Sequence, residues 1–265
     1  SEYLGDTLPQ IATEKAGIMK AGVPFITAES SPDLLVLFEQ LAADAGALMS
    51  VVEPAAISDV EVARDQTSLT VHTTRWGELS IRTPLVGLHQ AANAALAVRI
   101  LETLEDDLRP DVDSVLEGVA AVVHPGRDEL VRVRDRNWLF DVAHNTAGVR
   151  SLVDTIDRLE LPRPLVAVVG VQGDKDWRTM LPALFSRVDA AVLTQPPTVL
   201  PERRWDPVAV ADQVESLTVV RVVPDFVKAV RMAEQRADGG TVVVTGSVHT
   251  VGGVMSLLGV DPYGR

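Results

Sequence analysis

The most constraining feature of this chain is a regular alternation of apolar runs and amphipathic stretches over its second half. Runs typical of buried strands lie at 138–142, 165–170, 189–194, 217–222 and 241–245. Helical patterns follow them at 147–159, 176–186, 207–214, 225–236 and 248–258. Because strands that alternate with helices form parallel units, this half predicts a doubly wound, Rossmann-like α/β sheet of five strands.

The first half is more mixed. A helix is predicted from Asp6 and Thr7 through Ile18, and a strand–helix–strand pattern over 23–52 predicts a parallel pair. Short alternating runs over 59–83 predict an antiparallel meander, and the helical patterns at 87–104 and 110–122 follow it. The turn at 124–126 is the best boundary, dividing the chain into parts 1–126 and 127–265.

Composition excludes several classes of protein. The 265 residues include no cysteine, so disulfides, thiolate metal sites and cysteine nucleophiles are excluded, which fits a cytoplasmic protein. The net charge of −13 argues against a nucleic-acid partner, and no apolar run is long enough to span a membrane. The chain starts at Ser1 in the middle of an apparent structural unit, so we expect it to be a fragment of a longer protein.

Polar residues gather where the predicted strands end. Asp141, His144 and Asn145 follow the run that ends at Phe140, and ligands of open α/β sheets bind at the carboxyl ends of strands. Buried polar groups there are unfavourable unless they are paired or hydrated, so we favour a site over structural hydrogen bonding. Lys175 and Ser247 follow two other strands beside small residues that suit anion binding at helix starts.

Three further residues are candidates with open alternatives. Arg127, after Pro125-Gly126, has a guanidinium suited to phosphate or carboxylate; an interdomain salt bridge is the alternative. Glu14 lies among small residues and can serve as a Mg²⁺ ligand, or else be half of a surface Glu–Lys pair. Asn93 lies three residues from Gln90, so the two amides can read a purine edge or form a polar stripe.

Taken together, the motifs resemble the folylpolyglutamate synthase/dihydrofolate synthase family, a branch of the Mur ligases. Their order and rough spacing match that family along essentially the whole chain. The matching segments are Leu4-Gly5-Asp6-Thr7-Leu8, Ile11-Ala12 with Glu14-Lys15-Ala16-Gly17-Ile18, Pro84-Leu85-Val86-Gly87-Leu88-His89-Gln90 with Asn93-Ala94-Ala95, Pro125-Gly126-Arg127, Phe140-Asp141-Val142-Ala143-His144-Asn145, Gly173-Asp174-Lys175-Asp176 and Thr245-Gly246-Ser247.

The resemblance implies an ATP-dependent ligase that joins L-glutamate to a folate or dihydropteroate carboxylate through an acyl phosphate. It implies ATP and Mg²⁺ as cofactors, part of the central ATP-binding domain in 1–126, a ligase domain in 127–265, and a monomer. It makes Glu14 a Mg²⁺ ligand and Asn93, Arg127 and Asp141 ATP contacts. By the same resemblance, His144 lies at the phosphate and glutamate end, and the same cleft takes in Lys175 and Ser247.

Three departures from the family pattern set limits. The sequence contains no G-x-x-x-x-G-K-[ST] phosphate loop, so we expect the chain alone to be inactive. No lysine lies between Lys20 and Lys175, where the family commonly has a carbamylated lysine that supports a second metal. Thr146 stands where a proline is usual. A non-catalytic remnant, or a Mur-type ligase for another acidic substrate, remains the alternative.

Overall fold

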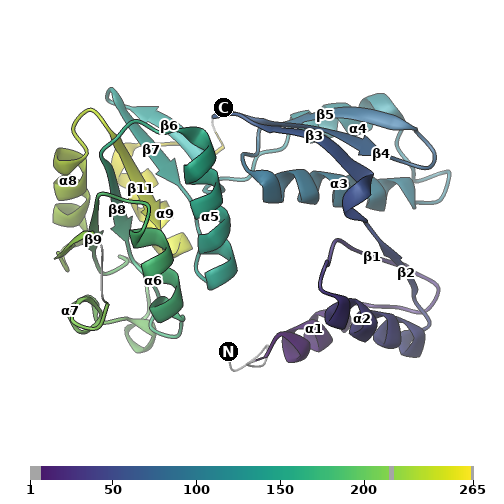
Figure 1. Ribbon diagram of the computed structural model, residues 1–265, viewed down its shortest axis with the longest axis horizontal. Helices are drawn as coiled ribbons and strands as arrows, with labels where there is room; N and C mark the ends of the chain where they lie inside the picture. Colours follow the sequence, from purple (N-terminus) through teal and green to yellow (C-terminus); the bar gives the residue numbers. More distant parts are fainter. Residues whose placement is uncertain (1–6, 215–217, 264–265) are drawn as a thin grey trace. The chain divides into compact units, whose positions relative to one another are not determined.

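The computed structural model describes residues 7–214 and 218–263 (Figure 1). The chain separates into two compact units: unit 1 takes in residues 1–61, 67–83 and 89–121, and unit 2 takes in residues 62–66, 84–88 and 122–265. The assignment of 1–126 to an ATP-binding domain and 127–265 to a ligase domain stays a prediction. The first predicted motif, through Asp6, lies outside the described residues, as does the start of the strand predicted at 217.

Within the described residues, unit 2 contains a six-stranded sheet in the order β10-β9-β8-β11-β7-β6. The strands are β6 (Glu129–Val133), β7 (Arg136–Phe140), β8 (Leu165–Val169), β9 (Ala190–Leu193), β10 (Val219–Val222) and β11 (Thr241–Thr245). All neighbours from β7 to β10 pair in parallel, which confirms the predicted Rossmann-like α/β class.

The sixth strand, β6, was not predicted. It pairs antiparallel with β7, and the turn residues Arg134 and Asp135 have φ of 50° and 62°, the left-handed backbone that tight hairpins require. β6 lies at the edge of the sheet and carries the charged residues Glu129 and Arg132. An edge strand needs no continuous apolar run, so the pattern used for the buried strands missed it.

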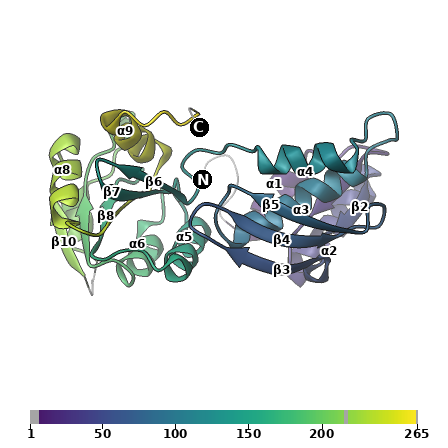
Figure 2. The same cartoon turned by 90° about the horizontal axis from the view of Figure 1, so that it is seen from above.

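Helices cover both faces of this sheet. The helices of unit 2 are α5 (Thr146–Leu159), α6 (Trp177–Phe185), α7 (Pro207–Ala211), α8 (Phe226–Arg236) and α9 (Val248–Leu258), with a short 3₁₀ turn η2 (Pro201–Arg203). α5 and α6 pack with Leu139 and Val243 on one face, whereas α8 and α9 pack with Trp138 and Val242 on the other. Figure 2 shows α6 and α9 on opposite sides of the strands. Burial on both faces explains the continuous Val-rich runs.

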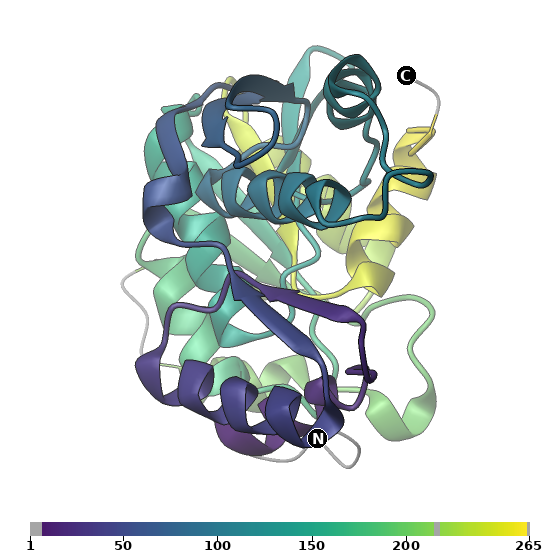
Figure 3. The same ribbon diagram turned by 90° about the vertical axis from the view of Figure 1, so that its right-hand side faces the viewer.

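Unit 1 contains a small parallel pair, β1 (Pro24–Thr27) and β2 (Leu48–Val51), as predicted. The helices α1 (Leu8–Ala16) and α2 (Pro32–Ala45) pack beside it around Phe38. Figure 3 shows the two helices, in dark purple, along one side of the strand pair. α1 begins with a capping box between Thr7 and Gln10 and ends at Gly17. It is therefore shorter than predicted, because Ile18 is 72% exposed and has no core to join.

The rest of unit 1 is a three-stranded sheet, within the described residues, packed against two helices. Its elements are η1 (Pro54–Ala56), β3 (Ile57–Val62), β4 (Thr67–His72), β5 (Glu78–Thr83), α3 (Leu88–Glu102) and α4 (Val112–Ala120). The predicted meander and both helices are confirmed, with somewhat shorter bounds. None of the helices in the described residues has the length and apolar character needed to cross a bilayer.

Candidate functional site

The candidate residues that follow strands of unit 2 lie at the carboxyl end of its sheet. Asp141 and His144 follow β7, Ser247 follows β11 and Lys175 follows β8. Because β11 lies between β7 and β8 and all three are parallel, their carboxyl ends are neighbours at intervals of about 4.8 Å. Ligands of open α/β sheets bind at this carboxyl end of the sheet.

Asp141 is the most tightly held of these residues. It is 5% exposed, its Oδ1 accepts a hydrogen bond from the Ala143 N–H at 2.8 Å, and its Oδ2 accepts one from the Asp128 N–H at 3.1 Å. Burial raises the pKa of Asp141 to about 6, against the lowering effect of both N–H groups and of the Arg127 and His144 charges. A carboxylate with two backbone donors is fixed in direction and still has lone pairs for a ligand.

Arg127 lies in a turn that is attached to this strand end. Gly126 precedes it with φ +66°, and an added Cβ there would lie 3.0 Å from Val251 and 3.1 Å from Val142. The Gly126 carbonyl accepts from the Val142 N–H at 2.8 Å, and its own N–H donates to Glu129 Oε2 at 2.8 Å. The turn therefore requires glycine, and Arg127 projects from a backbone held at both ends.

His144 has a defined tautomer. Its Nδ1 lies 2.9 Å from the Val142 carbonyl oxygen, which only accepts, so Nδ1 carries the proton and donates. In the neutral ring, Nε2 is then an acceptor. Asn145, interpreted from the sequence as part of the site, instead caps α5 by accepting from the Gly148 N–H at 2.8 Å.

The Ser247 side chain forms structural hydrogen bonds at the end of β11. Its hydroxyl donates to the Gly170 carbonyl at 2.8 Å and accepts from the Thr250 N–H at 3.1 Å, capping α9. Thr250 donates to the same carbonyl at 2.7 Å. Gly246, at φ +104°, approaches so closely that a Cβ would lie 2.7 Å from that oxygen. These bonds join the ends of β8 and β11.

Lys175 belongs to a charged group on the neighbouring loops. Its Nζ lies 3.2 Å from Asp174 Oδ2, and the Arg203 guanidinium lies 2.9 Å from the same oxygen. Although partial burial acts to raise the pKa of Asp174, hydrogen bonds from Arg203 and Lys175 hold it below its usual value. Arg203 lies in η2, and sequence patterns did not single it out.

The two candidates of unit 1 are exposed. Glu14 lies on the open face of α1, and the described residues contain no group of three or more His, Asp or Glu placed to hold a metal. On α3, the Asn93 amide donates to Gln90 Oε1 at 3.1 Å, so the predicted pair of amides does form one polar patch. Gln90 itself is buried, and its Nε2 lies 2.9 Å from His89 Nε2.

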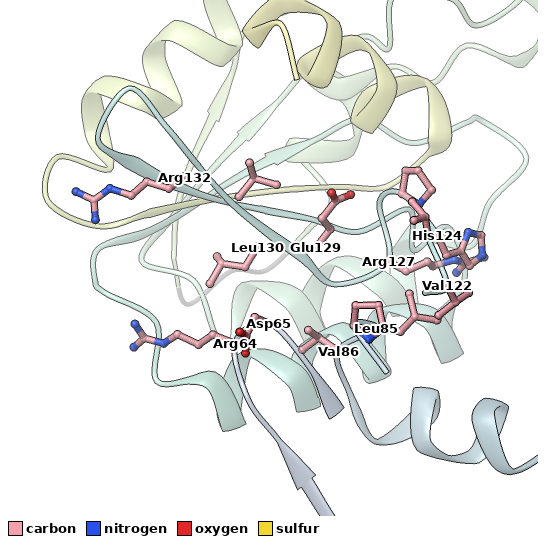
Figure 4. A pocket seen from close by; sticks show the side chains of 14 residues that line it. Arg64, Asp65, Leu85, Val86, Val122, His124, Arg127, Glu129, Leu130 and Arg132 are labelled. Atoms are coloured by element: carbon pink, nitrogen blue, oxygen red, sulfur yellow. The ribbon is translucent and has the colours of Figure 1, made fainter. Parts of the chain in front are cut away.

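Two hollows of unit 2 are lined by Arg127. One, of about 250 Å³, also takes in Arg64 and Arg132 (Figure 4). The other, of about 610 Å³, is mainly apolar and takes in Val142, Val251 and Met255. Arg64 was missed in the sequence: its guanidinium donates to the carbonyls of Leu159 and Glu160, 95 and 96 positions away. No local pattern signals such a contact.

Comparison with known proteins agrees with this geometry. The profile of the Mur ligase, glutamate ligase domain matches residues 126–248, which begin at the Gly126 turn and end just past Ser247. This part of the chain matches the Mur ligases. The strand ends described above are thus those of a Mur ligase glutamate-ligase domain.

The similar proteins belong to the branch that the motifs indicated. A dihydrofolate synthase/folylpolyglutamate synthase of Bacillus subtilis is 27% identical over 96% of the chain and 59% of its own length. The folylpolyglutamate synthase of Mycobacterium tuberculosis complexed with ADP matches with a TM-score of 0.83 and 30% identity, over 99% of this chain and 61% of that one.

A third similar protein is a bifunctional folylpolyglutamate synthase/dihydrofolate synthase with Mn, AMPPNP and L-glutamate bound. It gives a TM-score of 0.75 and 28% identity, over 98% of this chain and 59% of that one. The resemblance predicted from the motifs is confirmed. The chain spans about three fifths of the length of these relatives.

Proposed function

We propose that this chain is part of an ATP-dependent acid–amino-acid ligase that joins L-glutamate to a folate or dihydropteroate carboxylate through an acyl phosphate. The observation that carries the proposal is the Gly126 turn bonded to the end of β7, which places Arg127 beside the buried Asp141. Relatives solved with ADP, and with Mn, AMPPNP and L-glutamate, support nucleotide, divalent metal and amino acid as the ligand classes.

Each candidate residue of unit 2 has a proposed role that follows from its side-chain chemistry. The Arg127 guanidinium offers a fork for phosphate oxygens, and Asp141 accepts from a ligand hydroxyl while its own direction is fixed by two N–H groups. His144, with Nδ1 bonded to Val142, presents Nε2 toward the phosphate and glutamate end. Lys175 adds a cation on the next loop. Ser247, whose hydroxyl already donates and accepts, acts through the backbone it holds.

Unit 1 supplies the remaining proposed contacts. Mg²⁺ takes one or two carboxylates and completes its shell with water and phosphate oxygens, so the exposed carboxylate of Glu14 is a fitting ligand. When bound, the metal neutralises charge on the phosphates. The Asn93 amide, exposed on α3 and paired with Gln90, has the donor and acceptor needed for the edge of adenine.

The test is glutamate-dependent ADP release by the full-length protein, with dihydropteroate and tetrahydrofolate supplied separately. Turnover with either compound supports the proposal, and the ratio of the two rates separates dihydrofolate synthesis from polyglutamation. Turnover with neither, while ADP still binds, would refute the folate substrate and favour a Mur-type ligase with another acidic substrate.

A further inference from the structure

Asp128 carries a further buried carboxyl group, and its backbone is bonded to Asp141, a proposed nucleotide contact. The side chain of Asp128 is fully buried, and its Oδ2 accepts a hydrogen bond from the Thr155 hydroxyl on α5 at 2.7 Å. Its backbone N–H donates to Asp141 Oδ2. Asp128 therefore connects three parts of the domain: the turn that carries Arg127, the end of β7, and α5.

Stability alone does not favour an aspartate at this position. Asp128 has φ +46°, a left-handed conformation that is unfavourable for a residue with a side chain, although Asp tolerates it better than most. Burial of a carboxyl group beside another carboxyl group is a further penalty. A strained backbone conformation that persists despite such a penalty is typical of functional sites, where the conformation itself is needed.

Hydrogen bonding decides which carboxyl group of the pair carries the negative charge. Asp141 accepts two backbone N–H groups, which stabilise its ionised form, whereas Asp128 is completely buried, which disfavours its ionised form, and accepts a hydrogen bond from the Thr155 hydroxyl. Burial raises the pKa of Asp128 well above its usual value and Asp141 raises it further; Thr155 and Arg127 lower it, and Asp154 on α5 raises it. Asp128 is then the partner that keeps the proton.

We propose that Asp128 is a positioning residue of the nucleotide site, a neutral carboxylic acid that fixes the Arg127 turn and leaves the negative charge on Asp141. The inference rests on the proposed function, because it assigns Arg127 and Asp141 to the nucleotide. Ionisation of Asp128 places a second negative charge beside Asp141 and Arg127. The affinity for ATP, itself an anion, then falls.

The test is the KM for ATP of the full-length protein as a function of pH. In the wild type we expect the KM for ATP to rise by about threefold to tenfold as pH rises through the range in which Asp128 ionises, well above the usual range of Asp. In Asp128→Asn, which is neutral at every pH and whose Oδ1 still accepts from Thr155, the KM should change much less. The KM for glutamate should be the same in both proteins. Parallel pH profiles for the two proteins would overturn the proposal.

Thr155→Val gives a test that changes no charge. Loss of the hydroxyl donor disfavours ionised Asp128, so the rise of the KM for ATP should move to higher pH. The matched control is Asp157→Asn, which removes a half-exposed carboxylate on the same helix that pairs with Arg187. The control should keep the wild-type profile, and a profile shifted equally in both variants would count against a specific role for Asp128.

Infrared spectroscopy reports on the proton directly. A protonated buried carboxyl group absorbs as a C=O stretch that ionised carboxylates lack, so the wild type should show a band that persists above the usual range of Asp and that Asp128→Asn lacks. Absence of the band in the wild type would overturn the assignment. If the full-length protein shows no glutamate-dependent turnover, the proposed function fails, whereas the infrared band and the pH dependence of ADP affinity still test Asp128.

Discussion

Both units carry candidate residues in the sequence, but the structure supports them differently. In unit 2, Asp141 is buried and held by two backbone N–H groups, and Arg127 extends from a turn bonded to the same strand end. In unit 1, Glu14 and Asn93 lie on exposed helix faces. The difference indicates that the candidate residues of unit 2 have directions fixed by the fold, whereas those of unit 1 are exposed to solvent.

The largest effect should come from Asp141→Ala. Removal of the carboxylate leaves the Asp128 and Ala143 N–H groups without that acceptor and removes a proposed ATP contact. A lost charged hydrogen bond is equivalent to about 2–3 kcal/mol, so kcat/KM for ATP should fall by about 10²-fold. Steady-state ADP release measures this, and the melting temperature should fall as well. A variant as active as Asp157→Ala would show that Asp141 is only structural.

The next effect compares one glycine from each unit. Gly126→Ala combines a positive φ with Cβ contacts near 3.0 Å, and should destabilise the protein by about 2–4 kcal/mol. Gly77→Ala, in the β4–β5 turn of unit 1, has a similar φ of +68° but nothing within 4 Å, and should cost about 1 kcal/mol. Urea denaturation of the two variants tests the comparison, and equal losses would contradict the close packing of the Arg127 turn.

A smaller effect is the dependence of stability on pH. Since the folded-state pKa values of Asp128 and Asp141 are raised, their contribution to stability is greatest below the usual range of Asp. The part due to Asp141 is lost as pH rises through about 6, and the part due to Asp128 is lost as pH rises through its own raised pKa. Because asparagine does not titrate, the free energy of unfolding of Asp128→Asn should decrease less with rising pH than that of the wild type. Its free energy of unfolding relative to wild type should therefore increase as pH rises above about 4, by an amount on the order of 1 kcal/mol. A constant difference would contradict the buried pair.

The smallest effect on the fold should come from Glu14→Gln. Because this side chain is exposed on α1, the melting temperature should not change measurably. The variant should still raise the Mg²⁺ concentration needed for half-maximal turnover by the full-length protein. Unchanged Mg²⁺ dependence would remove Glu14 from the proposed site and leave it as a surface residue.

The sequence predicted most of the fold because buried strands and amphipathic helices leave periodic patterns. It failed where structure depends on distant contacts or on edge positions. β6 is charged and lies at the sheet edge, so it has no apolar run, and α1 stops at Gly17 because nothing covers Ile18. These are tertiary effects that propensity does not contain.

The sequence likewise predicted some residues of the candidate site and missed or misread others. The strand-end residues Asp141, His144 and Ser247 were found because polar side chains follow apolar runs. Asn145 matched that pattern, but its amide is used to cap α5. Asp128 gave no signal, because burial of an acidic residue in a turn depends on Thr155, 27 positions away.

The most direct measurement of the central claim is the KM for ATP of Arg127→Lys in the full-length protein. Lysine keeps the charge but loses the planar fork, so the account predicts a KM for ATP raised about tenfold, with the KM for glutamate unchanged. The control Arg187→Lys, whose arginine pairs with Asp157 on the surface, should match wild type. A KM for ATP in Arg127→Lys equal to that of the control would contradict the claim that this turn holds the nucleotide.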